Sequence, residues 1–184
     1  MELKKAIEQR HCVRKFKDKK AKIADIISVL ESALKAPCAG NIFTVRLILV
    51  DEAEKKAKLA DAALNQNFVA EASHVIVVCS SKSQIELAYG NRGKAYAKQQ
   101  AGAAIQNMFL RATDLGLGMC WIGAFNDDAV KRVLQIPDEV DVEAILPVGY
   151  ETGKAYPRKK PELKEIVGFN RYGFKISGKK KVVT

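Results

Sequence analysis

Side chains that do acid–base or nucleophilic chemistry are scarce in this 184-residue sequence. It has two histidines, His11 and His74, and four cysteines that lie far apart without any C-x-x-C pair. Neither histidine lies in a nucleophile-elbow motif and no H-E-x-x-H motif occurs, so a hydrolase triad or a zinc site has almost no candidate residues. The wide cysteine spacing also argues against a disulfide framework. We therefore expect a bound cofactor to carry the chemistry.

Two basic segments have the residue types that bind a phosphate group. Arg10 and Arg14 bracket His11 and Cys12, and Arg158-Lys159-Lys160 lies near the other end of the chain. A guanidinium offers a planar fork of donors that matches phosphate oxygens. The alternative for each segment is a solvated basic patch, which charge runs usually form.

The positive charge of the chain is confined to its two ends. The net charge is +10, of which residues 1–22 contribute +6 and residues 151–184 contribute +7, whereas the stretch between them carries −3. This pattern fits solvated tails, a nucleic-acid surface, or two ends that converge on one compact anion. Aromatic residues make up 7% of the chain and no stacking platform is evident, so nucleic acid is the least favoured partner.

Small residues mark two further candidate binding segments. Residues 37–41 form a small-residue loop ending in an asparagine, and residues 116–125 combine a glycine-rich entry with Gly123 and Ala124. Both segments would let backbone N–H groups approach a planar ring. Taken alone, the first is an ordinary turn and the second a buried strand with Trp121 in the core. Gly116-x-Gly118 lacks a third glycine and follows a helix, so it does not predict a dinucleotide fold, and no P-loop motif occurs.

The elements that position these segments follow from hydrophobic periodicity. Helices are predicted over residues 2–9, 22–35, 52–64, 96–115 and 127–134, with a short helix after Pro161. Strands are predicted over residues 44–50, 74–80, 119–124 and 142–148, with an extended stretch at 172–177. Residues 81–95 are predicted to be irregular and are a candidate lid. The small residues of the helix over 96–115 predict a central position for it.

Composition places the chain among globular proteins. With 48% hydrophobic residues it has enough apolar content for a folded core, and no apolar run approaches the length of a membrane span. The first residues lack the apolar stretch of a signal peptide. We find no repeat or linker, so we expect one domain over residues 1–184 in a cytoplasmic protein that does not contact a membrane, with residues 176–184 as a basic tail.

Six segments together resemble the FMN-dependent nitroreductase family over nearly the whole chain. They occur in the family's order and spacing: AIEQRHCVRKF at 6–16, APCAGN at 36–41, ASHVIVV at 72–78, AIQNM at 104–108, LGLGMCWIGAF at 115–125 and AILPVGY at 144–150. The resemblance implies an α+β, three-layer fold with a central mixed β-sheet flanked by helices. It also implies an intertwined homodimer with two FMN sites at the subunit interface.

The resemblance further implies the reaction. NAD(P)H would deliver a hydride to flavin N5, and a small-molecule acceptor (a nitroaromatic, a quinone or another flavin) would then take the electrons in a ping-pong cycle. No side chain is assigned a catalytic role and no metal is expected.

The resemblance assigns the following cofactor-binding residues. Arg10, His11, Cys12 and Arg14 match the segment that contacts the phosphate and ribityl chain. Pro37, Cys38, Ala39 and Asn41 match the loop that reaches the flavin from the partner subunit. Asn65 matches an asparagine near the isoalloxazine ring, and Ile122, Gly123 and Ala124 match the strand along it. Arg158 and Lys160 match a C-terminal phosphate clamp.

The sequence departs from the family pattern at three places. Cys12 and Cys38 stand where the family usually has serines, and Phe43-Thr44-Val45 replaces the usual Gln-Pro-Trp. These departures leave the acceptor open. A flavin oxidase or dehalogenase-like enzyme, and an FMN-binding sensor, are the alternative interpretations within this fold.

Overall fold

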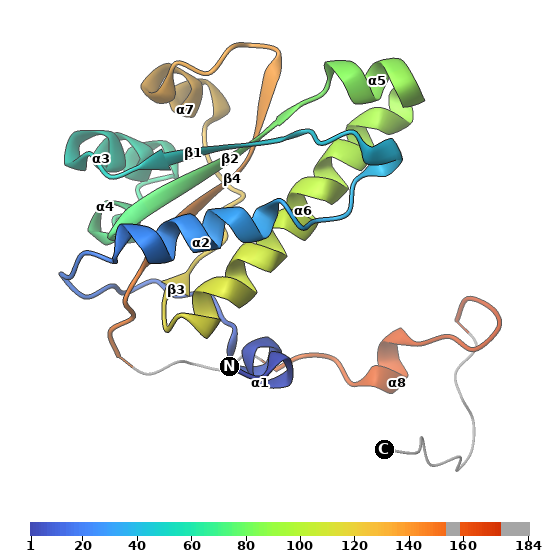
Figure 1. Ribbon diagram of the computed structural model, residues 1–184, viewed down its shortest axis with the longest axis horizontal. Coiled ribbons are helices and arrows are strands. Elements are labelled where there is room, and N and C mark those ends of the chain that lie inside the picture. The colour runs from blue at the N-terminus through green and yellow to red at the C-terminus, as the bar shows by residue number, and fades with distance from the viewer. Residues whose placement is uncertain (154–158, 174–184) are drawn as a thin grey trace.

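The computed structural model describes residues 1–153 and 159–173 and contains a four-stranded sheet in the order β1-β2-β4-β3 (Figure 1). The strands are β1 (Val45–Val50), β2 (His74–Ser81), β3 (Gly118–Met119) and β4 (Val140–Gly149). All three strand pairs are antiparallel. The sheet of the described residues is thus antiparallel, whereas a mixed sheet was predicted; an isolated bridge outside the strands, between Cys12 and Met119, is parallel.

Helices cover both faces of the sheet and give three layers (Figure 1). They are α1 (Leu3–Gln9), α2 (Ile23–Ala33), the 3₁₀ turn η1 (Ala39–Asn41), α3 (Ala53–Ala62), α4 (Phe68–Glu71), α5 (Ser83–Tyr89), α6 (Asn91–Asp114), α7 (Asp127–Leu134) and α8 (Leu163–Ile166). Helices α2 and α6 pack on one face, and α3, α4 and α7 on the other. The α+β, three-layer fold predicted from the sequence is therefore confirmed.

The central strand β2 shows how the sequence specifies these layers. Its residues alternate, so that Ile76 and Val78 join the core under α2 and α6, whereas Val75 and Val77 join the core under α3 and α7. Successive side chains of a strand point to opposite faces, and apolar residues on both faces require cover on both. The small residues predicted to make α6 central, Ala101 among them, are buried against this sheet.

The prediction of an irregular lid over residues 81–95 is wrong. Residues 83–89 form α5, and α6 already begins at Asn91. Gly90 separates the two helices with φ of +56°, a conformation that favours glycine. Gly93 then lets the helices approach closely, because a Cβ there would lie 2.6 Å from the Ile85 carbonyl oxygen. These two glycines weakened the helical pattern in the sequence, but they allow α5 and α6 to pack against each other.

The strand predicted over residues 119–124 is shorter in the structure, where β3 ends at Met119. The antiparallel pairing itself continues, since Ile122 exchanges two backbone hydrogen bonds of 3.1 Å with Ile145. Between these pairs Cys120 donates to the Pro147 carbonyl at 3.2 Å, and proline has no N–H to return the bond. Pro147 is therefore the reason that the ladder is interrupted.

The described C-terminal segment, residues 159–173, lies outside the three layers (Figure 1). Each of its residues is exposed, including Leu163, Ile166, Phe169 and Tyr172. Residues 174–177 of the predicted extended stretch lie outside the described residues. Among the helices that the structure describes, none combines the length and the apolar character that crossing a bilayer requires.

Candidate functional site

The N-terminal basic segment is fixed to the edge of the sheet beside β3. Val13 donates its backbone N–H to the Met119 carbonyl at 2.9 Å, and Lys17 donates to the Tyr150 carbonyl at 2.8 Å. Val13 and Phe16 are buried as apolar anchors, while Arg14 between them is exposed. The two buried side chains and the two backbone hydrogen bonds hold this strongly basic stretch at a defined position on the sheet.

His11 is held between two acceptors. Its Nδ1 lies 2.8 Å from the Gln9 carbonyl oxygen, and its Nε2 lies 2.9 Å from Oε1 of Glu151. Burial lowers the pKa of His11, but the hydrogen bonds to Gln9 and Glu151 outweigh it and raise the pKa above its ordinary value of 6.5. Glu151 had no signal in the sequence analysis, because its role depends on a contact across 140 residues.

Cys12 shows that the surroundings of this segment favour a negative charge. The Cys120 thiol hydrogen-bonds to its sulfur, as does the Trp121 backbone N–H, and Arg14 and Arg10 add positive charge. These contacts outweigh the opposing effect of burial and lower the pKa of Cys12 to about 5. An environment that stabilises a thiolate at neutral pH also suits a phosphate oxygen, so these residues fit the terminal phosphate of FMN.

Arg10 is placed between the helical layer and this edge. Its guanidinium carbon lies 5.7 Å from the centre of the Phe109 ring of α6, within the range of a cation–π contact. Phe109 is buried, so it is a fixed platform. The arginine is therefore oriented by packing on α6.

The segment after β3 offers backbone donors next to the basic residues. Ile122 is buried and paired with β4, whereas Gly123 and Ala124 are exposed. Within the part of the chain that the structure describes, the N–H groups of Gly123 and Ala124 donate to no other protein group. Exposed N–H groups fit the role of donors to a flavin ring. Trp121 is 42% exposed, so the alternative in which it belongs to the core is wrong.

Asn65 lies on the turn that supports the same segment. The Asn126 N–H donates to the Ala62 carbonyl at 2.8 Å, which ties the end of α3 to the residues after Ala124. Asn65 follows three residues later, exposed and with φ of +60°. The structure thus places Asn65 on the same side of the fold as residues 122–124.

The loop with Pro37, Cys38, Ala39 and Asn41 is not brought to this site within one chain. Gly40 lies against the Tyr89 hydroxyl, and the Tyr89 ring centre is 5.3 Å from that of Tyr96. These contacts place the loop near the start of α6. Arg10 packs on Phe109, 13 residues further along the helix, which is about 20 Å at the α-helical rise of ~1.5 Å per residue. Figure 1 shows α5 at one end of α6 and α1 at the other.

The two halves of the predicted C-terminal clamp have different outcomes. Arg158 lies outside the described residues. Lys160 is exposed and lines a shallow hollow with Lys159, Pro161, Glu162 and Glu165. The described residues show no contact between Lys160 and the Arg10–Arg14 segment.

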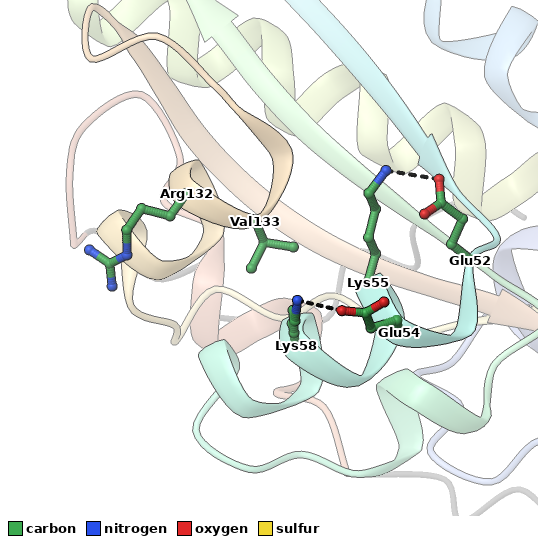
Figure 2. Close-up of a pocket in the computed structure, with 6 residues that line it drawn as sticks. All are labelled: Glu52, Glu54, Lys55, Lys58, Arg132 and Val133. Carbon is green, nitrogen blue, oxygen red and sulfur yellow. Dashed lines mark hydrogen bonds and ion pairs between the residues drawn. The ribbon is translucent and has the colours of Figure 1, made fainter.

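A second hollow lies between α3 and α7, and it contains none of the predicted site residues (Figure 2). Lys55 pairs with Glu52 at 2.8 Å and Lys58 pairs with Glu54 at 2.6 Å on its α3 side. Arg132 and Val133 line its α7 side. Its charges on α3 are paired with one another, so this hollow is a solvated surface feature.

The arrangement is a three-layer α+β fold with a basic segment beside an open strand end. The Nitroreductase family model matches residues 7–77 and 62–150, and the chain belongs to this family. The family resemblance found in the sequence is thus confirmed.

Relatives of known name and structure agree with this assignment. The chain is 27% identical over 179 residues to an FMN reductase (NADPH) from Bacillus subtilis, with 90% of this chain and 71% of the relative covered. The structure of the NfrA1 nitroreductase from B. subtilis superimposes with a TM-score of 0.85 at 26% identity, over 92% of this chain and 74% of that one. The NADPH:FMN oxidoreductase from Vibrio harveyi, complexed with NAD+, shares the fold at 21% identity with a TM-score of 0.85, over 92% and 77% of the two chains.

Proposed function

We propose that this chain is an FMN-dependent oxidoreductase that takes electrons from NAD(P)H and works as a homodimer. The observation that carries the proposal is the junction at Cys12, where the Cys120 thiol, the Trp121 N–H and two arginines favour a negative charge beside the exposed residues Gly123 and Ala124. Phosphate and flavin ring need these two kinds of donor next to each other. The names of the relatives, an FMN reductase and a nitroreductase, support the same class.

At the phosphate end, Arg10 and Arg14 would hold the terminal phosphate, with His11 and Cys12 beside them. The His11–Glu151 pair fixes the imidazole at this edge and favours its protonated form, which adds positive charge. Arg158 and Lys160 are proposed as further cations from the C-terminal segment.

At the ring end, Ile122 anchors the strand while Gly123 and Ala124 present backbone donors, with Asn65 nearby. When bound, FMN would supply the redox chemistry, which is hydride transfer from NAD(P)H and reduction of a nitro, quinone or flavin acceptor. Donors aimed at the ring stabilise the negative charge that reduction creates, and fixed backbone groups do so without reorganising.

The second subunit completes the proposed site. One chain keeps its Pro37–Asn41 loop about 20 Å along α6 from its own Arg10. In a two-fold dimer the loop of one chain reaches the basic segment of the other. The exposed apolar side chains of residues 159–173 would lie on that partner, since such residues are otherwise costly to leave in water.

Removal of the two arginines tests the phosphate end. We expect Arg10→Ala with Arg14→Ala to purify mostly without FMN, measured by the flavin absorbance per protein. Arg46→Ala with Arg132→Ala is the matched control, because it removes two guanidiniums from β1 and α7 and should retain FMN. Full FMN occupancy in the Arg10/Arg14 variant would contradict the phosphate assignment.

Mixed dimers test whether the site is shared. A chain with Arg10→Ala and Arg14→Ala and a chain with Ala39→Trp should each lose FMN when alone. In a mixed dimer, one site pairs the altered basic segment with the altered loop and should not bind FMN. The other site pairs an unchanged basic segment with an unchanged loop, so we expect one FMN per dimer. A mixed dimer without FMN would refute a site built from two chains.

Turnover separates the enzyme from its alternatives. We expect NADH or NADPH to bleach the flavin rapidly under anaerobic conditions, and a quinone or nitroaromatic to restore its absorbance. Slow bleaching would favour an FMN-binding sensor, and activity with oxygen or a halogenated phenol alone would favour an oxidase or dehalogenase-like enzyme.

A further inference from the structure

The start of β2 carries a buried chain of hydrogen bonds that the proposed function does not use. Ser73 is 7% exposed and His74 is 4% exposed. The Ala21 backbone N–H donates to Oγ of Ser73 at 2.7 Å, and this Oγ lies 2.9 Å from Nδ1 of His74. The two contacts join the segment that precedes α2 to the central strand of the sheet.

The balance of donors and acceptors in this chain defines the state of the histidine ring. A serine hydroxyl has one hydrogen to donate and two lone pairs that accept. Oγ of Ser73 accepts the Ala21 N–H, and within residues 1–153 and 159–173 the acceptor left for the hydroxyl hydrogen is Nδ1 of His74. Nδ1 is therefore unprotonated, and the neutral ring carries its proton on Nε2.

A second proton on the ring removes this balance. Both nitrogens of an imidazolium are donors, so Nδ1 of His74 would point a hydrogen at Oγ of Ser73, and the hydroxyl hydrogen would lose its acceptor. A buried donor without a partner is costly. The backbone at Ser73 has little room to adjust, because a Cβ on Gly149 would lie 3.1 Å from the Ser73 nitrogen. Rotation of the Ser73 side chain pairs its hydroxyl again, but it gives up the bond from Ala21.

The charges around His74 keep the ring neutral at pH 7. Lys56 of α3 donates to the two backbone carbonyls just before His74, at 2.6 and 3.5 Å. Lys20 lies 3.5 Å from Asp51, which follows β1, and β4 contributes the uncharged Val148 opposite His74. Burial lowers the pKa of His74 below its ordinary value of 6.5; Asp51 opposes this shift, and Lys20 and Lys56 add to it. The ring therefore takes up its second proton only in acid.

We propose that His74 is a pH-sensitive switch: when its ring is protonated, Ser73 releases the Ala21 N–H and residues 18–22 detach from the start of β2. The N-terminal basic segment stays in place, because Val13 and Lys17 keep backbone hydrogen bonds of 2.9 and 2.8 Å to carbonyls that do not titrate. The switch thus loosens the connection between this segment and α2 in acid, whether or not a cofactor is bound.

Hydrogen exchange of single backbone amides tests the switch in the full-length protein. We would measure exchange by NMR from pH 7.5 to 5, divide each rate by the intrinsic rate at that pH, and follow the His74 ring in the same samples. Protection of the Ala21 amide should fall roughly fivefold or more as the ring titrates, which corresponds to the loss of one buried hydrogen bond. The Lys17 amide is the internal control and should keep its protection, because its acceptor is the Tyr150 carbonyl.

Three outcomes of this experiment would overturn the proposal. The first is constant protection of Ala21 while the His74 ring titrates. The second is an equal loss of protection at Ala21 and Lys17, which indicates general unfolding. The third is a ring that stays neutral until the whole protein unfolds. The wild-type protein alone gives these results, so a variant that fails to fold cannot hide them.

Variants then assign the effect to the two side chains. His74→Asn keeps an acceptor for the Ser73 hydroxyl but cannot be protonated, so Ala21 should be equally protected at pH 7.5 and 5. Ser73→Ala removes the acceptor of the Ala21 N–H and should lower its protection at both pH values. His11→Asn is the matched control, because it removes the other histidine and should leave the pH dependence at Ala21 unchanged. Persistence of that dependence in His74→Asn, or its loss in His11→Asn, would assign the titration to another group and refute the switch.

Discussion

Gly118 on β3 leaves no room for a side chain, and its substitution gives the sharpest test of how the basic segment is held. A Cβ at this position would lie 2.5 Å from Cγ2 of Val13, 2.9 Å from its Cβ and 3.1 Å from its Cγ1. Carbon atoms pack best at about 3.5–4.0 Å, so Val13 must move by about 1 Å. Val13 is buried and its N–H is bonded to the Met119 carbonyl, so this shift displaces the backbone beside Cys12.

We expect Gly118→Ala to lower the free energy of unfolding by about 1–3 kcal/mol, the usual cost of overpacking a well-packed core. Urea unfolding at a fixed protein concentration measures it, because the stability of the proposed dimer would depend on concentration. The matched control is Gly102→Ala in α6, where a Cβ meets only Trp121 at an ordinary 3.8 Å. That change should stabilise the protein by roughly 0.5–1 kcal/mol, since alanine favours a helix over glycine.

A double variant identifies Val13 as the cause. Val13→Ala removes the contacts at 2.5 Å and 3.1 Å but leaves the Cβ at 2.9 Å, so the relief is partial. We expect Gly118→Ala with Val13→Ala to be more stable than the sum of the single effects predicts, by at least ~0.5 kcal/mol. Additive effects, or a Gly118→Ala variant as stable as the wild type, would refute the packing that we describe.

Three further predictions concern the charged groups of the same edge. In a proton NMR titration the two histidines should separate, because hydrogen bonds raise the pKa of His11 above 6.5 and burial lowers the pKa of His74 below it; a single shared midpoint would contradict this. Glu151→Gln should lower the pKa of His11. The His11–Glu151 pair stabilises the fold below the unfolded-state pKa of His11, and this stability is lost as pH rises through the folded-state pKa. Urea unfolding at pH 5 should therefore show a lower free energy of unfolding for Glu151→Gln than for the wild type. With the pKa of Cys12 at about 5, its rate of alkylation by iodoacetamide should change little between pH 6.5 and 8, whereas the rate of a free thiol rises about tenfold per pH unit. The stability that the Cys12 thiolate contributes should fall as the pH drops from about 9 through 5. A Cys12 alkylation rate that rises like that of a free thiol would show that the thiolate is not stabilised.

Periodicity predicted the layers of this fold well because the signals are local. The alternation in β2 and the apolar spacing in α2 are properties of neighbouring residues, and the predicted helix over 127–134 has the bounds of α7. The errors arose where a distant residue decides the outcome. Pro147 on β4 interrupts the pairing of the predicted strand over 119–124, and Gly93 allows α5 to pack on α6.

The candidate site was predictable in part from the same logic. Residue types indicated Arg10 and Arg14 as candidate phosphate ligands, and in the structure both lie close enough to Cys12 to act on its charge. The contacts of Cys120 with Cys12 and of Glu151 with His11 had no sequence signal, because each joins segments more than 100 residues apart.

Helix α6 imposes a restriction on how this chain can vary in length. It is a rigid rod of 24 residues that carries the loop contacts near one end and the Arg10 contact towards the other. Adding one turn between Tyr96 and Phe109 would push these contact points apart by about 5.4 Å. Insertions should therefore be excluded from the middle of α6 and tolerated in surface turns, so the length of this helix fixes the distance between the loop and the basic segment.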